Sequence, residues 1–192
     1  MASSSARSDV GELGAVYLSR AQIAARIGEL AVEIDRDYAM LDPILVAPLK
    51  SSVVFLADLT RALRVPHTLD VIELAPYTGG RGGGVQLLTD IDSPLEDRHV
   101  LIVEDVVDTG LTLHFLSRTL ALRAPASLAA VTLLDRPYRR LVDEIPLSYI
   151  GFTVPDELFA GYGLGLDERW RALPDLHVIG SVELPRAATD AA

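Results

Sequence analysis

The sequence predicts an α/β fold with a central, mainly parallel sheet flanked by helices. Two observations support this prediction. Short runs rich in valine, isoleucine and leucine alternate along the chain with segments whose apolar residues recur at helical spacing. The most pronounced unit, residues 99–116, joins an apolar run to an acidic pair, a glycine-containing turn and an amphipathic segment. Because ligands bind at the carboxyl edge of such sheets, this unit is also the first candidate for a binding site.

The composition is that of an ordinary globular protein and excludes several classes of function. The chain of 192 residues is most simply one main domain, with 49% apolar and 23% charged residues. Its net charge of −10 argues against a general nucleic-acid or anionic-membrane surface. The absence of cysteine excludes disulfides, thiol catalysis and thiolate metal sites, and the four histidines lack metal-ligand spacing. No apolar run suits a signal peptide or a membrane span, which predicts a cytoplasmic protein.

The amino-terminal part is expected to form a strand and a long helix. Residues 1–12 are small and polar and are expected to be a disordered tail, followed by a short edge strand at residues 15–18. Ser19 and Gln22 have the spacing of a capping box, which predicts a helix that runs to about Tyr38. The apolar residues on one face of this helix are Ile23, Ile27, Leu30, Ala31 and Ile34.

A buried strand at residues 43–47 is expected to end in a turn and a second helix. A lone lysine in such a turn is usually a solvated charge. Lys50, however, lies at the same edge of the predicted sheet as residues 104–112, and Ser51 and Ser52 open the helix that follows, which suits a diphosphate. The apolar residues predicted to face inward from this helix are Val53, Leu56, Ala57, Leu59 and Leu63.

A glycine-rich segment follows the third predicted strand, residues 68–74. Five glycines occupy six positions at 79–84, and such a sequence has no fixed structure by itself. It is either a hairpin tip that leads into a strand at residues 85–88, or a mobile lid that carries Tyr77 over a ligand.

The second half of the chain continues the alternation. Strands are predicted at residues 126–134, 148–152 and 177–181, with a short helical or turn segment at 167–173. The domain is expected to span residues 13–184, followed by a tail at 185–192.

The unit at residues 99–116 carries the chemistry. Its apolar run predicts a buried strand that ends in Glu104 and Asp105, and the turn at 106–112 feeds a helix. Free backbone N–H groups at that turn, with the hydroxyls of Thr109 and Thr112, suit a phosphate. Two carboxylates would repel the phosphate unless they hold sugar hydroxyls or Mg²⁺. The alternatives are a solvated acidic pair or the carboxylates of a receiver-type signalling domain. The apolar face of the helix is Leu113, Leu116 and Leu120.

The residues VLIVEDVVDTGLT resemble the phosphoribosyl diphosphate (PRPP) binding motif of type I phosphoribosyltransferases. The form Glu-Asp-x-x-Asp-Thr-Gly-x-Thr is most similar to the hypoxanthine-guanine phosphoribosyltransferases, and residues 151–176 resemble their carboxyl-terminal segment without a gap. The resemblance implies a type I phosphoribosyltransferase fold with a small carboxyl-terminal hood, largely from residues 136–175, and a mobile glycine-rich loop. It also implies PRPP and a purine base as substrates, Mg²⁺ as cofactor, and a homodimer or homotetramer.

The implied activity is transfer of the 5-phosphoribosyl group to hypoxanthine or guanine in purine salvage. The resemblance assigns the 5-phosphate to Thr109, Gly110, Leu111 and Thr112, the ribose hydroxyls and Mg²⁺ to Glu104 and Asp105, and pyrophosphate to Lys50, Ser51 and Arg171. It implies a cis peptide bond beside Lys50. Asp108 is the candidate general base or acid at purine N7, with a helix cap as the alternative role. For Arg171 the alternative is a surface ion pair with Glu168.

The half of the site expected to bind the base departs from the family. The base-reading lysine falls on Arg136, the stacking aromatic falls on Leu158, with Phe159 beside it, and the metal-holding aspartate falls on Gly165, with Asp167 two residues on. In the lid, Pro76 replaces a serine although Tyr77 is kept. These departures support a second hypothesis, a PRPP- or purine-nucleotide-binding regulator with weak or no transferase activity.

Overall fold

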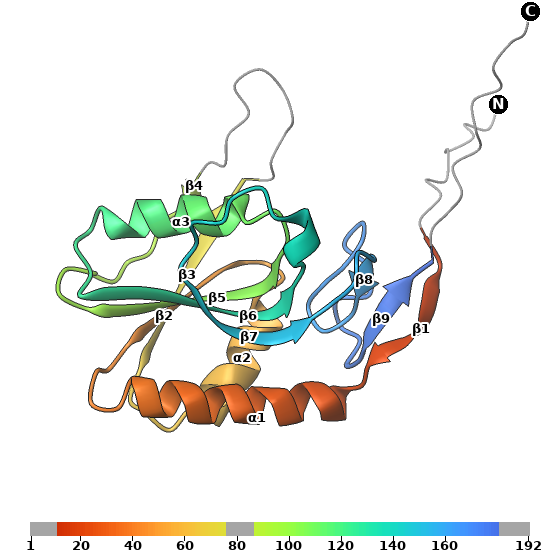
Figure 1. Ribbon diagram of the computed structural model, residues 1–192, viewed down its shortest axis with the longest axis horizontal. Helices are drawn as coiled ribbons and strands as arrows, with labels where there is room; N and C mark the ends of the chain where they lie inside the picture. Colours follow the sequence, from red (N-terminus) through yellow and green to blue (C-terminus); the bar gives the residue numbers. More distant parts are fainter. Residues whose placement is uncertain (1–10, 76–86, 181–192) are drawn as a thin grey trace, which may run out of the picture.

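The computed structural model describes residues 11–75 and 87–180, and the structural statements below concern these residues. A six-stranded sheet with helices on both faces forms the body of the protein, and a three-stranded sheet lies beside it (Figure 1). The predicted α/β fold with a mainly parallel central sheet is therefore confirmed. The predictions for residues 1–10, for 76–86 with Tyr77 and most of the glycine-rich loop, and for 181–192 lie outside the described residues.

The elements follow one another in an alternating order. In chain order they are β1 (Leu13–Leu18), α1 (Arg20–Asp37), β2 (Ile44–Leu49), α2 (Val53–Ala62), β3 (Thr68–Leu74), β4 (Leu87–Thr89), β5 (His99–Val107), α3 (Leu111–Ala121), β6 (Ser127–Asp135), the short 3₁₀ helix η1 (Pro137–Arg139), β7 (Leu147–Thr153), β8 (Phe159–Ala160) and β9 (Leu176–Ile179).

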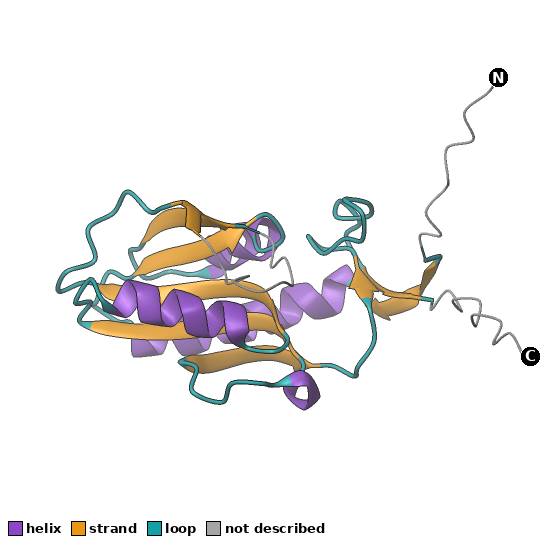
Figure 2. Cartoon of the chain, turned by 90° about the horizontal axis from the view of Figure 1, so that it is seen from above, coloured by secondary structure: helices purple, strands orange, loops and turns teal. Residues whose placement is uncertain are grey.

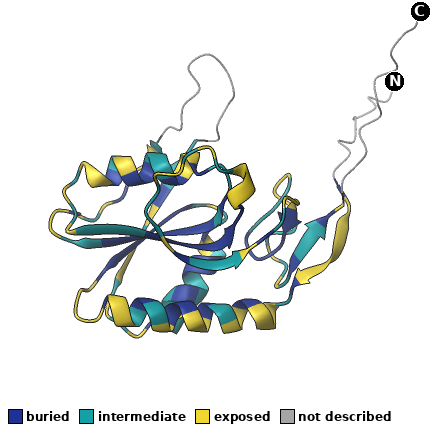
Figure 3. Ribbon diagram, in the orientation of Figure 1, coloured by how far each residue is buried: buried dark blue, intermediate teal, exposed yellow. Residues whose placement is uncertain are grey.

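The main sheet has the strand order β4-β3-β2-β5-β6-β7. The neighbouring strands β3, β2, β5, β6 and β7 run parallel, and β4 pairs antiparallel with β3 at the edge of the sheet. Helix α3 covers one face, whereas α1 and α2 cover the other (Figures 1 and 2). One apolar core lies under each layer of helices, and the central strands are buried from both sides (Figure 3). The carboxyl ends of β2, β5 and β6 therefore meet at one edge.

Helix α1 begins with the predicted capping box. The Ser19 hydroxyl accepts from the Gln22 N–H at 3.4 Å, and the Gln22 side chain accepts from the Ser19 N–H at 3.0 Å. All the apolar residues predicted to face inward from this helix are buried. Within the described residues, no helix is long and apolar enough to span a membrane.

Two local predictions were wrong. Val53 is 41% exposed, because the buried stripe of α2 runs through Phe55, Leu56 and Leu59, and Val53 lies beside that stripe. The turn predicted at residues 106–112 is shorter, because Val106 and Val107 remain in β5, where they pair with the last residues of β6.

The small sheet joins the two ends of the domain. Its order is β1-β9-β8, and both pairings are antiparallel. Strand β8 lies within the segment 136–175 from which most of the hood was predicted, and β1 and β9 pair in the same small sheet. Their pairing joins residues such as Val16 and His177, which lie far apart in the chain and carry no local signal for each other.

Candidate active site

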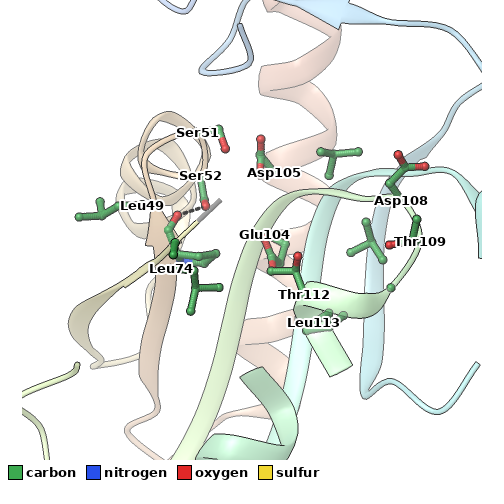
Figure 4. Close-up of a pocket in the computed structure, with 15 residues that line it drawn as sticks. Leu49, Ser51, Ser52, Leu74, Glu104, Asp105, Asp108, Thr109, Thr112 and Leu113 are labelled. Carbon is green, nitrogen blue, oxygen red and sulfur yellow. Dashed lines mark hydrogen bonds between the residues drawn. The ribbon is translucent and has the colours of Figure 1, made fainter. Parts of the chain in front are cut away.

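A cavity of about 340 Å³ opens at the carboxyl edge of the main sheet. Its wall combines the turn after β2, the end of β3, and the segment from the end of β5 into α3 (Figure 4). The lining residues are Pro48, Leu49, Ser51, Ser52, Leu74, Ala75, Glu104, Asp105, Val106, Val107, Asp108, Thr109, Gly110, Thr112 and Leu113. Segments that are separate in the sequence thus form one site.

Two buried carboxylates dominate the electrostatics of the cavity. Glu104 and Asp105 are each only 5% exposed. Burial raises the pKa of Glu104 well above its ordinary value, and the neighbouring Asp105 adds to the rise. Burial also raises the pKa of Asp105, although the nearby Ser51 hydroxyl acts in the opposite direction and lowers it. Glu104 Oε1 is buried and has no hydrogen-bond partner in the described part of the chain. The pair is therefore suited to a cation or to hydroxyl donors.

The donor set fits Mg²⁺ better than a metal held by the protein alone. Within residues 11–75 and 87–180, no group of three or more His, Cys, Asp or Glu side chains is arranged to hold a metal ion. Mg²⁺ commonly uses one or two carboxylates and completes its shell with water and substrate phosphate oxygens. Glu104 and Asp105 can supply the protein share of such a shell.

Residues 108–110, hereafter the phosphate turn, lead from β5 into α3. Gly110 has a positive φ of 81°, and an added Cβ would lie 3.0 Å from the Val142 carbonyl oxygen. The Thr109 hydroxyl accepts from the Leu111 N–H at 3.4 Å. The N-cap residue Gly110 has no side chain to cap α3, so among the described residues the first N–H groups of the helix other than that of Leu111 are open to an anion. The side chain of Leu111 is 39% exposed, and this residue contributes only its backbone here.

Asp108 lies between the cavity and two arginines. Its Oδ2 is 3.6 Å from Arg136 Nη1 and 3.8 Å from Arg139 Nη1. Its Oδ1 is buried without a hydrogen-bond partner in the described structure. The alternative role of Asp108 as a helix cap is wrong, because the capping position is Gly110.

Arg136 is 6% exposed, and its Nη2 donates to Asp156 Oδ1 at 2.6 Å. Leu158 is 51% exposed and is not part of the cavity wall formed by the described residues. Phe159 is buried in the core, with its ring centroid 4.9 Å from that of Tyr17. The prediction that Phe159 contacts a base is therefore not supported, since its ring already packs inside the protein.

Lys50 and Arg171, the cations that the sequence analysis assigned to pyrophosphate, both form ion pairs with Glu168. The peptide bond between Leu49 and Lys50 is cis, as expected. Lys50 Nζ lies 3.5 Å from Glu168 Oε2, and Arg171 Nη2 lies 3.1 Å from Glu168 Oε1. Arg171 lowers the pKa of Glu168. Arg171 Nη1 also donates to the Gly163 carbonyl at 2.9 Å. Lys50 and Arg171 thus lie near each other but outside the cavity wall, in contrast to Ser51, which lines it.

Comparisons with known proteins agree with this geometry. Residues 16–164 match the phosphoribosyl transferase domain family. The hypoxanthine phosphoribosyltransferase of Salmonella typhimurium is 42% identical over 163 residues, covering 83% of this chain and 91% of the relative. The chain belongs to the hypoxanthine-guanine phosphoribosyltransferase family.

Solved structures of family members have the same fold. A hypoxanthine-guanine phosphoribosyltransferase from Bacillus anthracis superposes with a TM-score of 0.83 at 38% identity, covering 88% of this chain and 99% of that one. A mutant hypoxanthine phosphoribosyltransferase from Trypanosoma cruzi, complexed with the product IMP, gives a TM-score of 0.81 at 36% identity and covers 92% of this chain and 95% of that one.

The backbone around Gly165, the position expected for the family's aspartate, leaves little room for a side chain. A Cβ on Gly165 would lie 2.5 Å from the Arg169 carbonyl oxygen and 2.8 Å from Arg171 Cγ. An aspartate would therefore require the loop to shift. Asp167 is exposed and does not belong to the cavity wall among the described residues, so it does not replace the family's aspartate there.

Sequence reasoning missed several residues of the site. Leu74 and Ala75 line the cavity because β3 lies next to β2, and only the strand order reveals this. Ser52, which the sequence placed at the start of a helix suited to a diphosphate, is buried in the cavity wall, and its hydroxyl donates to the Pro48 carbonyl. Glu168 appeared in the sequence only as an alternative partner for Arg171, with no signal that it also pairs with Lys50.

Replacement of Glu104 by glutamine should stabilise the ligand-free protein at pH 7.5. A raised carboxyl pKa means that stability falls as pH rises from the unfolded value through the folded one. The thermal midpoint of Glu104→Gln should exceed that of the wild type by about 2–4 °C, and the gap should narrow toward pH 5. Glu96→Gln, at an exposed position, is the control. A variant no more stable than the wild type at pH 7.5 would contradict the burial argument.

Replacement of Gly165 by alanine should destabilise the protein by about 1–3 kcal/mol, because the added methyl group meets the Arg169 carbonyl. Chemical denaturation measures this change. Gly28→Ala is the matched control, since a Cβ there meets nothing within 4 Å and α1 should gain up to about 1 kcal/mol. Equal stability of Gly165→Ala and the wild type would show that the loop yields freely.

Proposed function

We propose that this protein transfers the 5-phosphoribosyl group from PRPP to hypoxanthine or guanine, releasing pyrophosphate and forming the nucleoside monophosphate in purine salvage. The observation that carries the proposal is one cavity in which a buried acidic pair, Glu104 and Asp105, adjoins the phosphate turn and Asp108. Carboxylates that accept from sugar hydroxyls, next to N–H groups that donate to a phosphate, suit a sugar phosphate. The relatives described above, which are named as transferases of this class, support the same activity, and none supports the regulator hypothesis.

The phosphate turn is proposed to hold the 5-phosphate. Backbone N–H groups of Gly110, Leu111 and Thr112 stand at the amino terminus of α3, where the helix dipole favours an anion. The hydroxyls of Thr109 and Thr112 add donors at the cavity wall. This arrangement fixes one end of PRPP and leaves C1 of the ribose free to face the base.

The acidic pair is proposed to accept the ribose hydroxyls and to hold Mg²⁺. When bound, this ion neutralises charge on the departing pyrophosphate. Ser51, which lines the cavity, is proposed to lie with Lys50 and Arg171 on the pyrophosphate side. Glu168 forms ion pairs with both Lys50 and Arg171. Because exposed ion pairs contribute only about 0–1 kcal/mol, the multiply charged pyrophosphate is expected to displace Glu168.

The base is proposed to bind beside Asp108, on the side where this residue faces Arg136. Asp108 Oδ1 lacks a partner in the described structure and is placed to exchange a proton with purine N7. Arg136 is fixed by Asp156 and donates to the 6-oxo group, in place of the family's lysine. Leu158 offers an exposed apolar contact. Tyr77 as a lid residue, the homodimer or homotetramer, and the cytoplasmic location stay predictions.

Turnover is the direct test. Incubation with PRPP, Mg²⁺ and each of hypoxanthine, guanine, xanthine and adenine should release pyrophosphate with at least one of the 6-oxopurines. Omission of Mg²⁺ should abolish release. Measurable PRPP binding without turnover on any base would refute the transferase proposal and favour the regulator.

Substitution of Asp108 by asparagine should separate chemistry from binding. The amide cannot exchange the N7 proton, so kcat should fall by roughly 10²–10⁴-fold, whereas PRPP affinity should change little. The control is Asp90→Asn, which removes a surface carboxylate paired with Arg123. Equal losses of kcat and PRPP affinity would show that Asp108 serves binding instead.

A further inference from the structure

Arg140 lies directly behind the phosphate turn. It follows η1 in the segment that connects β6 to β7, and its guanidinium forms an ion pair with Asp135, the last residue of β6. The two side chains are only 11% and 8% exposed. A guanidinium so deeply buried is normally paired and hydrogen-bonded, and here the pair anchors Arg140 to the end of a central strand.

The side chain of Arg140 packs against the backbone of Gly110. A Cβ built on Gly110 would lie 3.1 Å from Arg140 Cδ and 3.4 Å from Arg140 Nη1. The backbone makes a second connection, because the Leu141 N–H donates to the Thr109 carbonyl at 2.9 Å. The segment around Arg140 therefore forms the back wall of the turn whose front lines the cavity.

One donor of this arginine is unused. Nη1 is shut off from solvent and has no hydrogen-bond partner in the described part of the chain. A buried N–H without an acceptor is unfavourable, and native structures seldom keep one without a reason. The donor lies beside Gly110, at the amino terminus of α3, where an anion is expected. Asp135 pairs with Nη2 of Arg140 and so balances the guanidinium charge, whereas Nη1 has no partner among the described residues.

We propose that Arg140, anchored by Asp135, is a positioning residue for the phosphate turn. It fixes the backbone of Thr109 and Gly110 and places a positive charge behind the N–H groups that receive a terminal phosphate. This inference rests on the proposed function for the identity of the ligand. It adds to that function two residues, Asp135 and Arg140, from outside the cavity wall.

The test compares ligands that differ by the phosphate. Equilibrium binding of IMP, ribose 5-phosphate and inosine is measured for the wild type, Arg140→Met and Arg140→Lys. The Met variant keeps an apolar stem but removes the charge, and it should weaken IMP and ribose 5-phosphate at least tenfold while inosine changes less than twofold. The Lys variant keeps the charge and should lie between Met and the wild type. Arg123→Met, which removes a surface ion pair with Asp90, should leave binding of all three unchanged.

The outcomes distinguish a positioning role of Arg140 from a contribution to packing alone. Unchanged IMP affinity in Arg140→Met, or equal weakening of IMP and inosine, would overturn the proposal. If the Met variant does not fold, the Lys variant decides: a severalfold loss confined to the phosphorylated ligands supports the proposal, and wild-type affinity overturns it. A protein that binds ribose 5-phosphate through Arg140 but turns over no base would overturn the proposed function alone. Failure of the wild type to bind any phosphorylated ligand would overturn both.

Discussion

The pairing of β5 with β2 on one side and β6 on the other is the interaction on which the site depends. Parallel pairing aligns the carboxyl ends of these strands, so the chain leaves each of them at the same edge. Glu104 and Asp105 then lie in a buried position at the centre of the sheet, next to the turn after β2. A strand at the sheet edge would leave such carboxylates hydrated, with pKa values nearer their ordinary range. Burial between two neighbouring strands raises the pKa values of both carboxyl groups.

The hood depends on a second set of contacts. The Tyr162 hydroxyl donates to Asp58 of α2, and a Cβ on Gly163 would come within 2.3 Å of the Ser51 carbonyl oxygen. These contacts hold the loop after β8 against the turn after β2. Arg171 donates to the Gly163 carbonyl, so its position follows from that docking. Lys50 and Arg171, the two cations proposed to face pyrophosphate, are thereby brought together from parts of the chain that lie far apart in sequence.

Charge is distributed unevenly over this acidic protein. The net charge of −10 excludes a general anion-binding surface, yet Arg136, Arg139 and Arg140 gather around the phosphate turn and Asp108. Each is paired with a carboxylate. Pairing of this kind makes the buried cations Arg136 and Arg140 tolerable in the interior. The net charge therefore gives no sign of this local cluster of arginines.

The sequence by itself determined most of the helices and strands and indicated which groups are expected to carry the chemistry. Apolar periodicity and capping residues are local, so β3 and α1 followed from residues close together in the chain. Only the tertiary structure decided what each side chain meets. Val107 pairs with β6 and so remains in a strand. Phe159 packs in the core beside Tyr17, and Glu168 forms ion pairs with both Lys50 and Arg171. The reason is physical: these contacts join residues far apart in sequence, and no local pattern encodes the partner of a buried ring or charge.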